Sequence, residues 1–172
     1  MRNLVFQFSI SMILLSSCGK SSLCDKKYDM LQQNWAYQDT LNFAFEVKDT
    51  MALYDIVLNV NHLSDYAYRN IYTKIYTQFP DNQRIQQVLS LDVSEPNGKS
   101  MGQCSSGKCS VEIALQPDAF FTKTGKYQIT LAQFMRSDSL KGIEKIGLRV
   151  TDTGKKRDLA AEAAATTKKQ KK

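Results

Sequence analysis

The 172-residue sequence has few of the residues and motifs on which catalysis and metal binding depend. It holds a single histidine, His62, and we recognise no nucleophile motif that would accompany it. We also find no HExxH zinc sequence and no phosphate-binding loop. The acidic residues Asp49, Asp55 and Asp65 could gather at one edge of the fold, but we interpret them as turn-capping and surface groups. The sequence therefore predicts a protein that is not an enzyme and has no cofactor and no metal.

Long hydrophobic runs are also missing, because no segment approaches the roughly 20 apolar residues of a spanning helix. The longest run, Leu4 to Leu15, follows the basic Arg2 and has the length of a cleaved signal peptide. It ends in Leu15-Ser16-Ser17-Cys18, which matches the lipobox of bacterial lipoproteins. We predict a signal peptide over residues 1–17, cleavage after Ser17, and acyl chains such as palmitate on Cys18.

The residues after Cys18 indicate where such a lipoprotein resides. Gly19-Lys20-Ser21-Ser22 contains no aspartate, so the usual inner-membrane retention signal is missing, and no acidic surface-export run follows. We therefore expect the cell envelope, on the periplasmic leaflet of the outer membrane. The lipid anchor is the predicted membrane contact.

The net charge of +6 is unevenly distributed. Residues 153–172 contain seven Lys and Arg side chains against only Asp158 and Glu162, so most of the basic excess lies in this tail. The remainder is close to neutral, which argues against nucleic acid as a partner. We predict a disordered basic tail over residues 152–172, and its contact with anionic lipid or peptidoglycan stays an open alternative to a solvated tail.

Four cysteines occur, of which Cys18 is assigned to the lipid. Cys104 and Cys109 flank a Gly- and Ser-rich turn, and the periplasm is oxidising, so a local disulfide between them is a candidate. Cys24 is left over. Its pairing with either loop cysteine stays open, because sequence does not fix connectivity.

The middle of the chain alternates apolar and polar residues with the period of β-strands. Turn residues bound seven such runs: 41–47, 54–60, 71–79, 85–93, 109–115, 127–135 and 146–150. This pattern predicts an all-β protein with a single β-sandwich of about seven strands, Ig-like or jelly-roll-like, over residues 35–151. We interpret residues 18–34 as the lipidated cysteine and a tether.

Three stretches resemble the family of the gliding-motility lipoprotein GldH. Phe43 to Val60 resembles its Phe-rich strand, Asp-Thr turn and aliphatic strand, and Tyr66 to Tyr72 resembles its Tyr-Pro-Tyr-Ser-Asn-Leu-Tyr segment. The most specific stretch runs from Gln133 to Val150, where QFMR, LKGI and IGLRV resemble the family's QYMR, LPGI and VGLRV. The resemblance implies a non-catalytic envelope protein of the gliding-motility and type IX secretion machinery.

Two binding hypotheses follow for this chain. Tyr and Arg dominate protein interfaces, so Tyr66, Tyr68, Arg69 and Arg136 are the predicted surface for other motility or secretion proteins of the envelope. The alternative from sequence is a glycan- or peptidoglycan-binding module in which Tyr66, Tyr68 and Trp35 stack on sugars. A structural interpretation stays open beside both, with Tyr66 and Tyr68 packed under the sandwich and Arg69 paired with Asp65.

Overall fold

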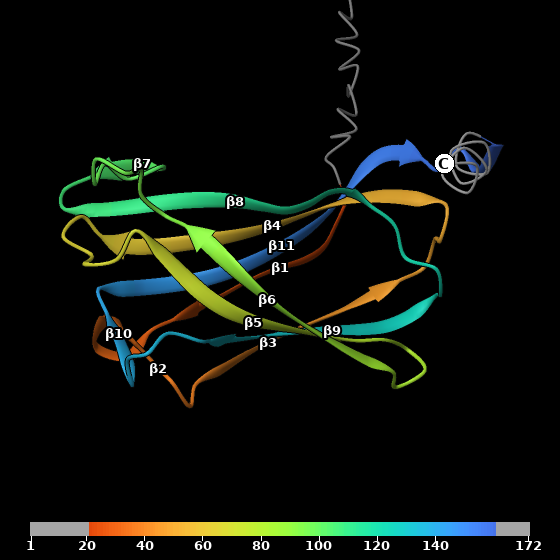
Figure 1. Cartoon of the computed structure of the whole chain (residues 1–172). Helices are drawn as coiled ribbons and strands as arrows, with labels where there is room; N and C mark the ends of the chain where they lie inside the picture. The colour runs from red at the N-terminus through yellow and green to blue at the C-terminus, as the bar shows by residue number, and fades with distance from the viewer. Residues whose placement is uncertain (1–20, 161–172) are drawn as a thin grey trace, which may run out of the picture.

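The computed structural model describes residues 21–160, and these form an antiparallel two-layer β-sandwich (Figure 1). The predicted signal peptide, the predicted lipidation site Cys18 and residues 161–172 lie outside the described part of the chain. The first sheet has the strand order β1 (Ser22–Asp29), β11 (Ile143–Lys156), β4 (Ala52–Leu63), β8 (Lys108–Ala119) and β7 (Gln103–Ser105). The second has the order β3 (Thr40–Val47), β9 (Gly125–Gln133), β5 (Asn70–Gln78) and β6 (Arg84–Asp92).

A short ribbon of β2 (Asn34–Ala36) and β10 (Ser139–Lys141) closes one end, preceded by the 3₁₀ turn η1 (Leu31–Gln33). Without the three-residue strands β2, β7 and β10, the two sheets read β1-β11-β4-β8 and β3-β9-β5-β6. Apart from the β5–β6 hairpin, consecutive long strands thus pass back and forth between two four-stranded sheets, which is the topology of a jelly roll. Of the two sandwich types expected from sequence, the structure adopts this one. No helix within residues 21–160 is long and apolar enough to span a membrane.

The alternation predicted for the strands is confirmed where one face is buried. Leu41, Phe43, Phe45 and Val47 all point from β3 into the core, with exposed residues between them. On β4 the buried face continues as far as His62. Side chains from these two strands meet between the sheets, as expected for two apolar faces packed against each other.

An aromatic cluster fills one end of the core. The Tyr127 ring lies 4.7 Å from Phe121, 5.8 Å from Phe79 and 5.9 Å from Phe45, measured between ring centroids. Its hydroxyl donates a hydrogen bond to the carbonyl oxygen of Lys123 at 2.9 Å. The cluster therefore joins β9 and β3 to the loop after β8.

Two predicted boundaries and the strand count are wrong. The predicted tether contains β1, which pairs with β11 from Ser22 to Asp29, and the predicted tail contains the end of β11, which pairs Lys156 with Ala52. Residues 21–160 contain eleven strands rather than about seven. β1 escaped prediction because it is an edge strand with one buried side chain, Cys24, and its backbone pairing leaves no apolar periodicity.

Candidate functional site

The two segments predicted as a partner surface lie together on the second sheet. Tyr68 comes from the β4–β5 loop, and Phe134, Met135, Arg136 and Ser137 follow β9. They line an open apolar groove of ≈ 830 Å³ together with two strand residues, Tyr72 of β5 and Val88 of β6. We refer to this groove as the aromatic groove.

Backbone and amide contacts hold the 134–137 segment in place. The Phe134 amide donates to the Tyr72 carbonyl at 2.7 Å, which extends the β9–β5 pairing by one residue. The buried Gln133 accepts from the Met135 amide at 2.9 Å and donates to the Ser137 carbonyl at 3.0 Å. A buried amide with both groups satisfied fixes the turn, so one wall of the groove is preformed.

The aromatic groove presents rings to solvent beside positive charge. Tyr68, Tyr72, Val88 and Phe134 are each 40–47% exposed. The Lys74 ammonium lies 3.9 Å from the centroid of the Phe134 ring, and Arg136 is exposed at the groove wall. Exposed aromatic rings beside cations are typical of protein contact surfaces.

Tyr66 supports the aromatic groove from below instead of lining it. Its ring packs 5.6 Å from His62 and 5.7 Å from Tyr68, and burial raises the pKa of its hydroxyl. Gly142, at φ +89°, packs against Tyr66, since an added Cβ would lie 3.4 Å from its ring, in ordinary van der Waals contact. Of the two tyrosines, therefore, only Tyr68 lines the aromatic groove.

Of the other predicted residues, the two arginines are exposed and Trp35 is buried. Arg69 and Arg136 are exposed, and within residues 21–160 neither forms an ion pair; in particular Arg69 does not pair with Asp65. Arg69 does not line the groove, and its carbonyl accepts from the Val93 and Ser94 amides at 2.9 and 3.1 Å. Trp35 is 1% exposed and donates to the Asp39 carbonyl. The expectation that Trp35 stacks on sugars is wrong, because its ring is buried. Tyr66 is half-buried, and its stacking on sugars stays a prediction.

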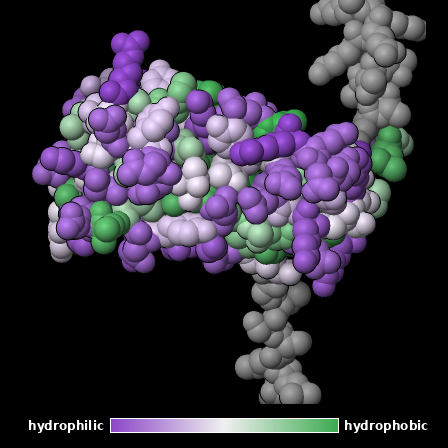
Figure 2. Space-filling view, turned by 90° about the horizontal axis from the view of Figure 1, so that it is seen from below, coloured by the Kyte–Doolittle hydropathy of each residue, from purple (hydrophilic) through white to green (hydrophobic). Residues whose placement is uncertain are grey.

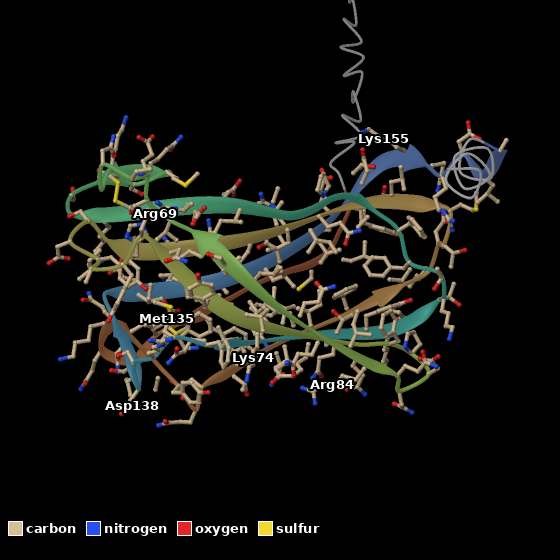
Figure 3. The ribbon with its side chains drawn as sticks, in the orientation of Figure 1. Arg69, Lys74, Arg84, Met135, Asp138 and Lys155 are labelled. Carbon is tan, nitrogen blue, oxygen red and sulfur yellow. A yellow bond between two sulfur atoms is a disulfide. The ribbon has the colours of Figure 1, made fainter. Side chains whose placement is uncertain are left out.

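A second, polar depression of ≈ 390 Å³ lies on the same sheet. The Arg84 guanidinium lies 4.1 Å from the Tyr76 ring centroid, and the Thr130 hydroxyl donates to the Asn42 amide oxygen at 2.7 Å. Figure 3 shows Met135, Lys74 and Arg84 in succession along this sheet.

The underside of the molecule is mostly hydrophilic, with hydrophobic residues in small separate areas (Figure 2).

Residues 98–102, GKSMG, have the GxSxG spacing of a serine-nucleophile turn, which the prediction from sequence missed. The Ser100 hydroxyl lies 3.3 Å from His62 Nε2, and His62 Nδ1 lies 2.7 Å from the Leu63 carbonyl oxygen. The imidazole is 2% exposed and packs against Tyr66. Ser100 belongs to a hairpin that bridges to Ser94, not to a strand-to-helix turn. We assign this pair to tying the hairpin to β4, since a substrate has no access to the imidazole.

The cysteines and acidic residues have structural positions. Cys104 and Cys109 are joined by a disulfide across the β7–β8 turn, and Cys24 is a buried free thiol whose pKa is raised by burial. The Asp49 carboxylate accepts from the Met51 amide and pairs with Lys156, and Asp55 accepts from the Asp118 amide. Within residues 21–160, no three His, Cys, Asp or Glu side chains are grouped as metal ligands.

Comparison with known proteins places these features in a family. The family model described as GldH lipoprotein matches residues 22–150, which include all the strands except the end of β11. A curated protein of Christiangramia forsetii, named a gliding motility lipoprotein GldH homolog, is 28% identical over 153 residues, covering 85% of this chain and 93% of its own length.

Two solved structures are distantly similar. One is a carbohydrate-binding module specific for non-crystalline cellulose, with 13% identity, 74% of this chain and 73% of that chain covered, and a TM-score of 0.39. The other is a family 35 carbohydrate-binding module from an environmental isolate, with 17% identity, 80% and 87% coverage, and a TM-score of 0.33. Likenesses of this size carry no argument about what the present chain binds.

Proposed function

Because this chain belongs to the GldH lipoprotein family, we propose that it is a non-catalytic envelope component of the gliding-motility and type IX secretion machinery. It acts by binding another envelope protein, while lipid on Cys18 holds it on the periplasmic leaflet of the outer membrane. The observation that carries the proposal is the aromatic groove, in which two separate segments meet with their rings exposed.

The residues that line the groove indicate what kind of surface its partner should have. Tyr68, Tyr72 and Phe134 offer apolar area on rigid side chains, which lose little entropy when they are covered. Lys74 and Arg136 are the cations beside them. The complementary surface is an apolar segment next to an acidic side chain, so that covering the rings brings opposite charges together.

The test is a double variant, Tyr68→Ala with Arg136→Ala, in affinity capture of envelope proteins. Both side chains are exposed, so the fold should persist and partner capture should fall by at least about tenfold, as when interface anchors are truncated. A matched control is Phe120→Ala with Lys126→Ala, an exposed aromatic and an exposed cation outside the groove. Undiminished capture by the folded groove variant would remove the groove as the binding surface.

A second candidate function, glycan binding, is favoured by the polar depression. There Tyr76 lies beside Arg84 and the hydrogen-bonding groups of Asn42 and Thr130, which is the mixture that orients a hydroxyl-rich ligand over a ring. If this candidate is right, the protein binds peptidoglycan or soluble polysaccharide and Tyr76→Ala weakens that binding about tenfold. An assembly factor without glycan affinity would bind neither material.

A further inference from the structure

We propose that two copies of this chain pair through strand β6, antiparallel and with the two Val88 residues facing each other on a two-fold axis. The pairing would join two second sheets into one continuous sheet of eight strands, four from each copy. It goes beyond the proposed function, although it covers one residue that also lines the aromatic groove, Val88.

β6 is an open sheet edge, and its sequence does nothing to protect it. It lies last in the order β3-β9-β5-β6, spans nine residues, and pairs with β5 without a bulge. It has no proline, no glycine and no lysine, and charges only at Arg84 and Asp92, its two ends. Edge strands normally carry such features because an open edge recruits other strands.

The other edges of the sandwich are protected. β1 carries Asp25, Lys26 and Lys27 in its middle. On β3 the carbonyl of Asn42 is occupied by the Tyr28 hydroxyl at 2.6 Å and the Lys26 ammonium at 3.3 Å. β8 is covered at one end by β7 and carries Pro117 and the left-handed Asp118 at the other. β6 alone among these edges is long, regular and undefended.

The free hydrogen-bonding groups of β6 can be identified from the pairing with β5. The Val93 amide donates to the Arg69 carbonyl, and the Phe79 amide donates to the Gln83 carbonyl, so odd-numbered residues of β6 point their backbone groups toward β5. Even-numbered residues therefore point theirs to the open edge. These five residues are Arg84, Gln86, Val88, Ser90 and Asp92.

The register centred on Val88 uses every one of these groups. It sets Val88 opposite Val88, Gln86 opposite Ser90, and Arg84 opposite Asp92 of the second copy, at both ends of the strand. Within residues 21–160 neither Arg84 nor Asp92 has an ion-pair partner in its own chain. Sliding the register by two residues in either direction would lose backbone bonds and would separate both pairs of opposite charges.

Exposed apolar surface is covered in the same arrangement. Val88 is 46% exposed and Ile85 is 47% exposed, although Ile85 lies on the core-facing side of the strand. Ile85 would face Leu91 of the second copy in a non-hydrogen-bonded pair, the kind of pair in which antiparallel neighbours approach most closely. The pairing would thus be stabilised both by opposite charges and by the burial of two isoleucines and two valines.

The test is cysteine crosslinking in the full lipid-anchored protein in the periplasm. In the proposed register the two residues at position 88 have Cα atoms about 5.5 Å apart, within the range of a disulfide. We expect Val88→Cys to give a disulfide-linked dimer. Gln86→Cys is the control, because its copies would lie about 13 Å apart along the strand, and it should stay monomeric. The double variant Gln86→Cys with Ser90→Cys should crosslink again.

Charge reversal tests the register independently of introduced thiols. Arg84→Asp or Asp92→Arg alone should weaken dimerisation in detergent solution by at least about tenfold, and the two together should restore it. Sedimentation of the unmodified protein as a monomer, equal crosslinking at positions 86 and 88, or crosslinking of Val88→Cys only to a different protein would each overturn the proposal. Loss of the dimer with intact partner capture would leave the function proposed for the groove unaffected.

Discussion

Replacing Tyr127 with alanine is expected to lower the free energy of unfolding by about 3–5 kcal/mol, the range found when a buried aromatic side chain is truncated. Tyr127 is 1% exposed and touches rings from three other segments, so its removal opens a cavity that Phe45, Phe79 and Phe121 cannot easily fill. Urea unfolding of lipid-free protein measures the change. A loss of this size is a large part of the stability of a domain of this length.

Tyr127→Phe is the matched control, because it keeps the ring and removes only the hydroxyl that donates to Lys123. Its expected cost is about 1 kcal/mol, with the Lys123 carbonyl left near solvent. Similar values for the two variants would mean that the hydrogen bond, not the packing of the aromatic cluster, provides the stability at this site.

The sequence predicts the strands that have one face in the core and one in solvent. β3 and β4 alternate cleanly, since every second side chain enters the core. β1 does not, because it sits at an edge and its stability comes from backbone pairing with β11, residues more than a hundred positions away. A search for period-two alternation detects strands by the burial of every second side chain, so it does not detect a strand of this kind.

The candidate site shows the same limit. Tyr68 and Arg136 could be found by residue type, and the resemblance to the GldH family pointed to both segments. Tyr72 and Val88 complete the aromatic groove only because β5 lies between β9 and β6 in the sheet. Nothing local in the sequence states that order. Trp35 failed as a surface residue for a related reason, since whether an aromatic ring is buried depends on which distant segment covers it.

The hydrogen-bonded pair of Ser100 and His62 shows that a sequence motif must be interpreted together with its structural surroundings. The GxSxG spacing alone would suggest nucleophilic catalysis. In this chain the serine lies in a hairpin and the histidine is buried on β4 against Tyr66, so their hydrogen bond connects the hairpin to β4. The GxSxG spacing alone therefore does not identify a nucleophile in this chain.

Removing the thiol of Cys18, the predicted site of lipidation, is expected to have the largest effect on function. Cys18→Ser should move the protein from the membrane fraction to the soluble periplasm, because two or three acyl chains supply an attachment that no single chain provides. Ser21 is already tied into the sandwich, where its carbonyl accepts from the Asp152 amide at 2.8 Å. Three residues span at most about 10 Å, so lipid on Cys18 would keep the domain next to the membrane surface.

The measurement is complementation of a deletion strain, scored by secreted proteins in the medium and by colony spreading where the strain moves. The intact gene should restore both, and Cys18→Ser should restore neither although the protein accumulates. Cys24→Ala is the control, because Cys24 is a buried thiol of β1 and its loss should leave the protein in the membrane fraction. Full complementation by soluble Cys18→Ser protein would show that the sandwich works without its anchor. Its contact surfaces, not its place at the membrane, would then be what the machinery requires.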